Sequence, residues 1–212
     1  IKESYVTDSN KECSAKCSFS FKYQTGSVSI KNVGETHLEL MYSSGRTAPV
    51  IFNGEKYNVS TIYILSTPLH YFDGEDSNQV GELLIYHTSL EGALPLIVAI
   101  PLVKTYVGKT LGSSSLENII FTAKDETAGA GDEVTINSDN FTLNDYFPPK
   151  NTPFYSYQGS HFLGTSHISG ETVHYIVYNK ENGILLKDDL PSPTRLYRHL
   201  LNQERHQYFP LN

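Results

Sequence analysis

Tryptophan is absent from the 212 residues of this chain, methionine occurs once, and cysteine occurs only twice. The two cysteines, Cys13 and Cys17, are close enough in sequence to form one local disulfide, or they remain free thiols. A metal site built on them would need further ligands nearby. The sequence therefore favours a domain that is stabilised by its own apolar core, for which 212 residues are sufficient.

Long apolar stretches and an excess of basic residues are also missing. The longest apolar stretch, LPLIVAIPLV at residues 94–103, covers about half of the roughly 20 residues that a membrane span requires, and its two prolines favour a buried strand instead. The formal net charge is −7, whereas a general nucleic-acid binder needs a basic surface. We therefore expect no nucleic-acid partner, and membrane association only through segments outside this chain.

The ends of the chain and its sequons favour a secreted or surface-exposed protein. The sequence begins with Ile1 rather than methionine, which indicates a processed or trimmed piece of a longer protein and leaves open whether that protein has a signal peptide or a C-terminal anchor. Sequons begin at Asn58 and Asn140, and both asparagines are candidate glycosylation sites. One basic cluster is interpreted either as a solvated helix face and tail or as a site for a sulfated glycan or anionic lipid; it contains Arg195, Arg198, His199, Arg205 and His206.

Short β segments dominate the sequence pattern. Alternating or β-branched residues between turn-forming sequences predict strands at residues 19–23, 26–33, 37–42, 58–65, 81–87, 95–103 and 172–178. Helices are predicted at residues 113–123 and 192–203, and loops at 128–133 and 147–153. We expect an N-terminal extension at residues 1–17 and a single, mainly β domain at residues 18–212 with small peripheral helices.

Four stretches resemble the α-class carbonic anhydrases. They are SIKNVGETHLEL at residues 29–40, STIYILSTPLHYFDG at 60–74, GELLIYHTS at 81–89 and FYSYQGSHFLGTSHISGETVHYIVY at 154–178. The predicted helix near the end and the RHQYFPLN segment at residues 205–212 are similar to the family's closing helix and tail. The resemblance covers most of the chain from about residue 18 and implies a large, twisted, mostly antiparallel central sheet.

The zinc ligands of that family are not found at the matching positions. The family holds zinc with two histidines at alternate positions of one strand and a third on the neighbouring strand. The resemblance places these ligands on Tyr63, Leu65 and Leu84, and a shift by one residue places the first two on Ile62 and Ile64. No histidine occurs between residues 38 and 69. The resemblance therefore implies a chain without the three-histidine zinc site, and no cofactor is expected.

Other residues of the family's active-site mouth are replaced as well. The resemblance places Leu69 at its gatekeeper glutamate, Thr165 at its zinc-water threonine and Glu35 at its proton-shuttle histidine. We expect these residues, with Phe162 and His167, to line the former mouth. By contrast, His70, Glu82 and His87 match residues behind the zinc ligands, and we interpret them as buried, hydrogen-bonded groups that support the sheet.

Two rival functions remain open at this stage. The first is a catalytically inactive, carbonic-anhydrase-like binding or structural module of a cell-surface, secreted or virion-type assembly, with protein partners and, as a further candidate, glycosaminoglycan. Its binding surface is expected at the former mouth or on a tyrosine-rich exterior that includes Tyr155, Tyr157, Tyr175 and Tyr178. The second is an enzyme with hydratase or esterase activity at a rebuilt metal site, for which His161 and His167 are the candidate ligands.

Overall fold

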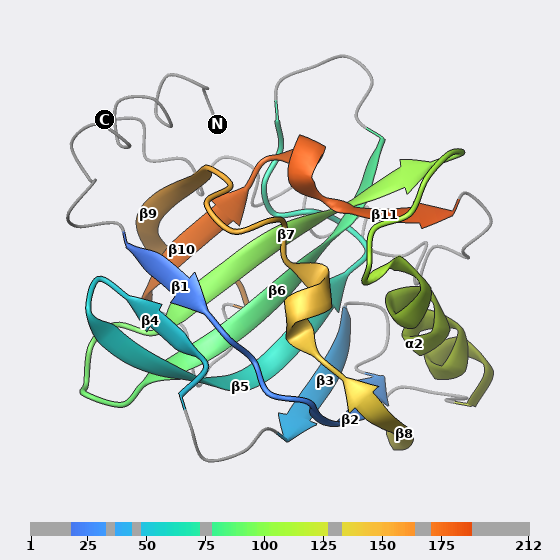
Figure 1. Cartoon of the computed structure of the whole chain (residues 1–212), viewed down its shortest axis with the longest axis horizontal. Helices are drawn as coiled ribbons and strands as arrows, with labels where there is room; N and C mark the ends of the chain where they lie inside the picture. The colour runs from blue at the N-terminus through green and yellow to red at the C-terminus, as the bar shows by residue number, and fades with distance from the viewer. Residues whose placement is uncertain are drawn as a thin grey trace.

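An 11-stranded, twisted sheet forms most of the structure (Figure 1). The computed structural model describes residues 18–32, 37–43, 48–72, 78–126, 133–163 and 171–187. The strands are β1 (Phe19–Phe21), β2 (Gly26–Asn32), β3 (His37–Ser43), β4 (Val50–Phe52), β5 (Glu55–Leu65), β6 (Gln79–Ser89), β7 (Leu96–Thr105), β8 (Glu133–Phe141), β9 (Phe154–Ser160), β10 (Thr172–Tyr178) and β11 (Ile184–Lys187).

The sheet is mostly antiparallel, as the sequence predicts. Its main path has the order β8-β2-β3-β5-β6-β7-β10-β9, while β4 joins β1 to β5. Only β10 and β11 run parallel to a neighbour among the described pairs, and both pair with the same edge of β7. The short 3₁₀ helix η2 (Lys180–Asn182) connects them, so β10 covers the first half of β7 and β11 the second half.

Gly183 allows the chain to pass close to β7 between these two strands. A Cβ atom at this position would lie 2.6 Å from the carbonyl oxygen of Pro101 and 2.8 Å from Cγ2 of Val103. Such contacts are too short for any residue with a side chain, so glycine is required where the backbone crosses from one half of β7 to the other.

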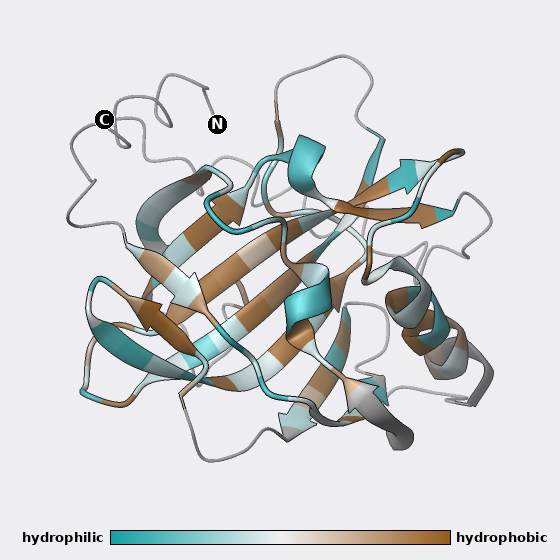
Figure 2. Cartoon of the chain, viewed as in Figure 1, coloured by the Kyte–Doolittle hydropathy of each residue, from teal (hydrophilic) through white to brown (hydrophobic). Residues whose placement is uncertain are grey.

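Both faces of the central strands are buried, because side chains point alternately to opposite faces of a sheet. Figure 2 shows the resulting hydrophobic stripes along β5, β6, β7 and β10. The first face packs under β1, β4 and the helix α2 (Ser113–Glu126), and its cluster includes Ile62, Ile85, Val98 and Ile176. The second face contains Tyr63, Leu65, Leu84, Ile97, Ala99 and Val177. Burial on both faces explains the continuous apolar stretch at residues 94–103.

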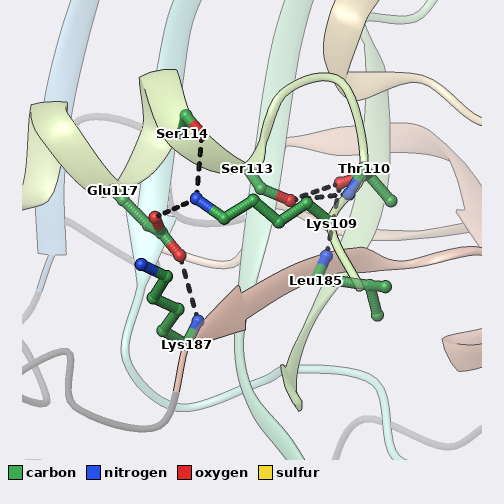
Figure 3. Close-up of polar contacts among 7 residues, drawn as sticks. All are labelled: Lys109, Thr110, Ser113, Ser114, Glu117, Leu185 and Lys187. Carbon is green, nitrogen blue, oxygen red and sulfur yellow. Dashed lines mark hydrogen bonds and ion pairs between the residues drawn. The ribbon is translucent and has the colours of Figure 1, made fainter. Parts of the chain in front are cut away.

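Helix α2 packs on the sheet through Leu116, Ile119, Ile120 and Ala123. A polar side chain of α2 and one of the loop before it also cover the outer edge of β11 (Figure 3). Glu117 Oε1 accepts a hydrogen bond from the backbone N–H of Lys187 at 3.0 Å, and Thr110 Oγ1 accepts one from that of Leu185 at 3.4 Å. These bonds satisfy donors that an edge strand otherwise leaves open to pairing. None of the described helices combines the length and apolarity needed to cross a bilayer.

The predicted strands and the first predicted helix are all present, with shifts of one to three residues at several ends. Four observed strands, β4, β8, β9 and β11, were not among the seven predicted ones. Strands β4 and β11 are too short for a pattern to develop, and β8 is rich in polar residues and begins at the end of a predicted loop. The predicted helix at residues 192–203 lies outside the described residues.

Candidate functional site

Glu82 on β6 is the centre of a buried hydrogen-bond network on the second face of the sheet. Its side chain is fully inaccessible to solvent, and its Oε1 atom lies 2.7 Å from Nδ1 of His70. Its Oε2 atom accepts hydrogen bonds from the backbone N–H groups of Leu69 and His70, at 2.8 and 3.3 Å. The carboxylate therefore fixes the backbone as well as the imidazole of the segment that follows β5.

His70 connects this carboxylate to Tyr157 on β9. The His70 Nε2 atom lies 2.6 Å from the Tyr157 hydroxyl. Burial, followed by Tyr175 and Glu82, raises the pKa of Tyr157 far above its ordinary value, so the phenol remains protonated and can donate. The three side chains thus form a chain Glu82–His70–Tyr157, in which His70 Nδ1–H donates to Glu82 and Nε2 accepts from Tyr157.

Aromatic packing fixes the orientation of this network. The rings of Tyr157 and Tyr175 stack with centroids 4.8 Å apart and an interplanar angle of 9°. The His70 ring meets both in edge-on contacts at 5.8 and 5.7 Å. Because every member is held by two or more neighbours, the arrangement has the rigidity of a core element rather than of an open reaction site.

The three positions to which the resemblance assigns lost zinc ligands are brought together on this same face. Tyr63 on β5 and Leu84 on β6 are directly opposite in the strand register, and Leu65 is opposite Glu82. All three side chains are buried in the apolar cluster of the second face. The Tyr63 ring also makes edge-on contacts with Phe162 at 5.0 Å and with His37 at 5.4 Å.

The atoms at these positions do not suit a zinc ion. Leu65 and Leu84 have no donor atoms, and burial, chiefly, raises the pKa of the Tyr63 phenol, which disfavours the phenolate that a metal would bind. Within the described ranges, no group of three or more His, Cys, Asp or Glu side chains is arranged to hold a metal ion.

Two histidines lie close to this cluster. His37 Nε2 is 3.3 Å from Glu39 Oε1; burial lowers the pKa of His37, and Glu39 opposes that change. His161, a candidate ligand of a rebuilt metal site, accepts a hydrogen bond at Nδ1 from the Leu163 N–H at 3.2 Å. Its ring stacks on Phe162 at 4.9 Å and makes an edge-on contact with Tyr86 at 5.3 Å.

The Nε2 atom of His161 is buried and has no hydrogen-bond partner among the described residues. Since Nδ1 is an acceptor, Nε2 bears the proton and is not a free lone pair for a metal. His167, the second candidate ligand, lies outside the described residues. Of the two candidate ligands of a rebuilt site, only His161 falls in the described part of the chain, and its Nδ1 atom already accepts a hydrogen bond from Leu163.

His87 lies on the opposite face of the sheet from the Glu82 network. Its Nε2 atom lies 2.9 Å from the Tyr23 hydroxyl, and its Nδ1 atom lies 3.2 Å from the carbonyl oxygen of Leu96. Complete burial lowers the pKa of His87 to about 4, against a weaker opposite effect from its backbone hydrogen bonds. His87 is thus an uncharged core residue that joins β6 to β7 and to the segment after β1.

The prediction of a tyrosine-rich exterior on the last strands is wrong. Tyr155, Tyr175 and Tyr178 are buried, and Tyr157 is half-buried and bonded to His70. The physical reason is that β9 and β10 have neighbours on both faces: Tyr155 and Tyr175 belong to the cluster of the second face and Tyr178 to that of the first. The alternation of side chains along a strand shows which of them share a face of the sheet, but it does not show whether other parts of the chain cover that face.

The other candidate residues lie in β5, in β8, beside the second face of the sheet or outside the described residues. Asn58 is half-buried in β5, opposite Thr88 of β6. Asn140 lies in β8, where only the backbone is described. Leu69 is half-buried against the cluster of the second face, as is Phe162. The remaining candidates lie outside the described residues: Cys13, Cys17, Glu35, Thr165 and the basic cluster at residues 195–206.

Besides the contact between Tyr23 and His87, the sequence patterns missed two polar pairs on the last strands. Tyr157 was not predicted to contact His70, although it belongs to the FYSYQGS segment on which the resemblance depends. Ser156 Oγ lies 2.7 Å from His174 Nε2 on the neighbouring strand β10. Burial lowers the pKa of His174, and no carboxylate bonds to it among the described residues, whereas a catalytic triad needs such a third group.

Comparisons with known proteins show the fold and nothing finer. No protein-family model matches the chain, and no curated protein matches its sequence. A solved carbonic anhydrase from Chlamydomonas reinhardtii, in complex with acetazolamide, is similar with a TM-score of 0.63 and 16% identity over 82% of this chain and 69% of that chain. An α-carbonic anhydrase from Photobacterium profundum is similar with a TM-score of 0.60 and 15% identity over 80% and 69%.

Proposed function

We propose that this chain, whose fold is that of the α-carbonic anhydrases, is a non-catalytic binding or structural module that lacks their zinc chemistry. It serves a cell-surface, secreted or virion-type assembly and contacts other proteins, with glycosaminoglycan as a further candidate ligand. The observation that carries the proposal is the apolar filling of the second face of the sheet. Tyr63, Leu65 and Leu84 meet there and are buried, where a zinc-dependent hydratase needs three imidazoles.

The energetics of this face support the loss of a metal. A zinc ion needs ligand atoms that replace its water shell, and an ion or ion pair in an apolar interior otherwise costs several kcal/mol. Leu84 is 0% exposed and packs among other apolar side chains, so it excludes both the ion and its activated water. Without that water, the reaction has no nucleophile at neutral pH.

The retained polar groups fit a structural role. Glu82 and His70 hold one another, the backbone of Leu69 and the hydroxyl of Tyr157. In such a network the carboxylate, the imidazole and the phenol are engaged with one another, as buried polar groups with a structural role usually are. A protein that works by binding can keep this fold and still have apolar residues where the family's enzymes hold their metal, because its function does not depend on the metal.

The test is a paired measurement of metal content and activity. We expect mass spectrometry of the purified native protein to find far less than one zinc per chain, and a CO₂-hydration assay on the same sample to equal the uncatalysed rate. An active α-carbonic anhydrase, treated and measured in parallel, controls for metal loss during purification. One firmly bound zinc per chain, or catalysed hydration, would contradict the proposal and favour the enzyme with a rebuilt site.

The binding role has a separate test. Glycan arrays, and pull-down experiments with defined surface proteins, should give a saturable interaction at physiological salt. For glycosaminoglycan, replacement of Arg195, Arg198 and Arg205 by glutamine should abolish binding, whereas the same change at the exposed Lys22 and Lys56 should not. Heparin binding that is unchanged in the arginine variant would place the ligand elsewhere.

A further inference from the structure

A tight turn of Asn53 and Gly54 joins β4 to β5 (Figure 1). Phe52 and Glu55 are directly opposite in the strand register, so no other residue belongs to the turn. The φ angles of Asn53 and Gly54 are +53° and +88°, and both residues are exposed. Successive positive φ angles characterise the hairpin turn whose twist matches that of the flanking strands, and Asn-Gly is a preferred sequence for it.

An asparagine that precedes a glycine can react with its own main chain. The glycine nitrogen attacks Cγ of the asparagine side chain, a cyclic imide closes, and the side-chain amide leaves as ammonia. Glycine favours this attack because no Cβ atom hinders its nitrogen.

Water then opens the imide at either of its carbonyl groups. Opening on one side gives aspartate. Opening on the other side gives isoaspartate, in which the main chain passes through the former side chain and is longer by one methylene group. The whole reaction consumes one water and releases one ammonia, without oxidation or reduction.

Both reacting groups of the turn are free of bonds that would hold them apart. Within the described residues, neither the Asn53 carboxamide nor the Gly54 N–H makes a hydrogen bond. A Cβ atom built on Gly54 would have no atom within 4 Å, so the space beside this part of the main chain is open. The Asn53 N–H donates to the Ser18 carbonyl at 2.9 Å, which leaves the side chain unbound. The rotation that brings the nitrogen to Cγ therefore meets no packed neighbour at Gly54.

The second Asn-Gly pair of the chain, Asn182–Gly183, has the opposite surroundings. Gly183 is buried, and its N–H donates to the Lys180 carbonyl at 3.0 Å. A Cβ atom at Gly183 would lie 2.6 Å from the Pro101 carbonyl oxygen. The Gly183 nitrogen can therefore attack Asn182 only after a local opening of the structure. The two pairs have the same two residues and differ in their environment, so each is a reference for the other.

We propose that Asn53–Gly54 is a site of spontaneous deamidation, and that its isoaspartyl product loosens β4 and β1. An added methylene group lengthens the main chain of a turn that has no spare residue. The pairing of Phe52 with Glu55 depends on that length, because loop length fixes the register of a hairpin. The proposal goes beyond the binding role and does not depend on the absence of zinc.

Strand β1 is expected to loosen together with β4. Among the described pairs, β1 bonds only to β4, and the turn itself bonds to Ser18, which precedes β1. Phe52 is 2% exposed, and its ring contacts Phe19 at 6.4 Å and His174 at 4.8 Å. A shifted register at the turn therefore also disturbs the aromatic contacts with which β4 covers the first face of the sheet.

Ageing of the full chain in its folded state tests the site. The protein is kept at mildly alkaline pH and body temperature for several weeks, and peptide mass spectrometry measures the conversion of Asn53 and Asn182. We expect Asn53 to convert at least about tenfold faster, since Asn182 must wait for a local opening. In guanidinium-unfolded protein the two rates should agree within about twofold, because the environments are then equal. Equal rates in the folded protein, or an Asn53 that stays intact there, would overturn the proposal.

Hydrogen exchange tests the effect on the strands. The isoaspartyl form is isolated by chromatography and compared with the unmodified chain and with Asn53→Asp, which adds the same charge without lengthening the main chain. We expect amide exchange at residues 19–21 and 50–52 to be at least about tenfold faster in the isoaspartyl form and unchanged in Asn53→Asp. Exchange in β6 and β7 should be the same in all three proteins. Equal exchange of the isoaspartyl form and Asn53→Asp would show that the added methylene group does not loosen β4.

Discussion

His87 is kept uncharged in the core, and this makes the stability of the protein depend on pH. Complete burial lowers the pKa of His87 to about 4, from the ordinary value of 6.5. Its two nitrogen atoms are already engaged, since Nδ1–H donates to Leu96 and Nε2 accepts from Tyr23. Burial, chiefly, raises the pKa of Tyr23 well above 10.0, so the phenol cannot become an anionic partner for a protonated imidazole.

The sign and size of the effect follow from proton linkage. The unfolded chain binds a proton at this imidazole near pH 6.5, and the folded chain only near pH 4. The contribution of His87 to stability is therefore complete above pH 6.5 and is lost as the pH falls toward 4. Between about pH 7.5 and about pH 4.5 the loss amounts to about 2.5 kcal/mol, with a maximum slope of about 1.2 kcal/mol per pH unit.

Urea unfolding of the unmodified chain and of His87→Gln, at several pH values in this interval, measures the effect. The variant should be less stable at about pH 7.5 because it loses hydrogen bonds, but the difference should shrink by about 2.5 kcal/mol at about pH 4.5. Burial also lowers the pKa of His37, His161 and His174, but these residues are present in both proteins and cancel in the comparison. A difference that stays constant within about 0.5 kcal/mol across the interval would refute the reasoning.

Three further substitutions test the network, the sheet edge and the apolar site. Glu82→Gln places an amide group among hydrogen-bond donors, so the free energy of unfolding, measured by chemical denaturation, should fall by about 3 kcal/mol. The exposed Glu91→Gln is the control and should change it little. Equal effects of the two substitutions would show that the network does not stabilise the fold. Glu117→Ala leaves the Lys187 N–H without its acceptor, so the exchange of that amide with deuterium should become about tenfold faster, and unchanged exchange would contradict the proposed edge protection. Leu84→His buries an imidazole in an apolar cluster, so the free energy of unfolding should fall by about 3 kcal/mol and the variant should not bind zinc. Firm zinc binding by this single variant would mean that nearby residues already form a partial metal site.

The sequence contains enough information for the central strands but not for the edges of the sheet. The continuous apolar stretch at residues 94–103 predicts a strand buried on both faces, and β7 is such a strand. Strand β11 has only four residues, ILLK, and exists because β7 offers a free edge and Thr110 and Glu117 cover the other side. Nothing within the four residues themselves contains that information.

In the candidate site too, local sequence predicts which side chains share a face but not which distant side chains contact them. The resemblance places Tyr63, Leu65 and Leu84 as neighbours, and the strand register does bring them onto one face. The partners Tyr157 and Tyr23 could not be assigned from sequence, because they lie 87 and 64 residues from His70 and His87. Such contacts depend on how distant strands are placed, which is a property of the whole sheet rather than of any local pattern.

The pairing of β7 with both β10 and β11 has a consequence for how the chain is made. During synthesis β7 emerges well before residues 172–187, which provide both of its parallel partners. Until then one edge of a strongly apolar strand remains open, and the two faces that it shares with β6 are incompletely covered. Parallel pairs between distant segments also form slowly, because a long loop must close first. The nascent chain therefore passes through an incomplete, aggregation-prone sheet. We expect the yield of folded protein in cells to depend on chaperones that shield β7 until β10 and β11 have been synthesised.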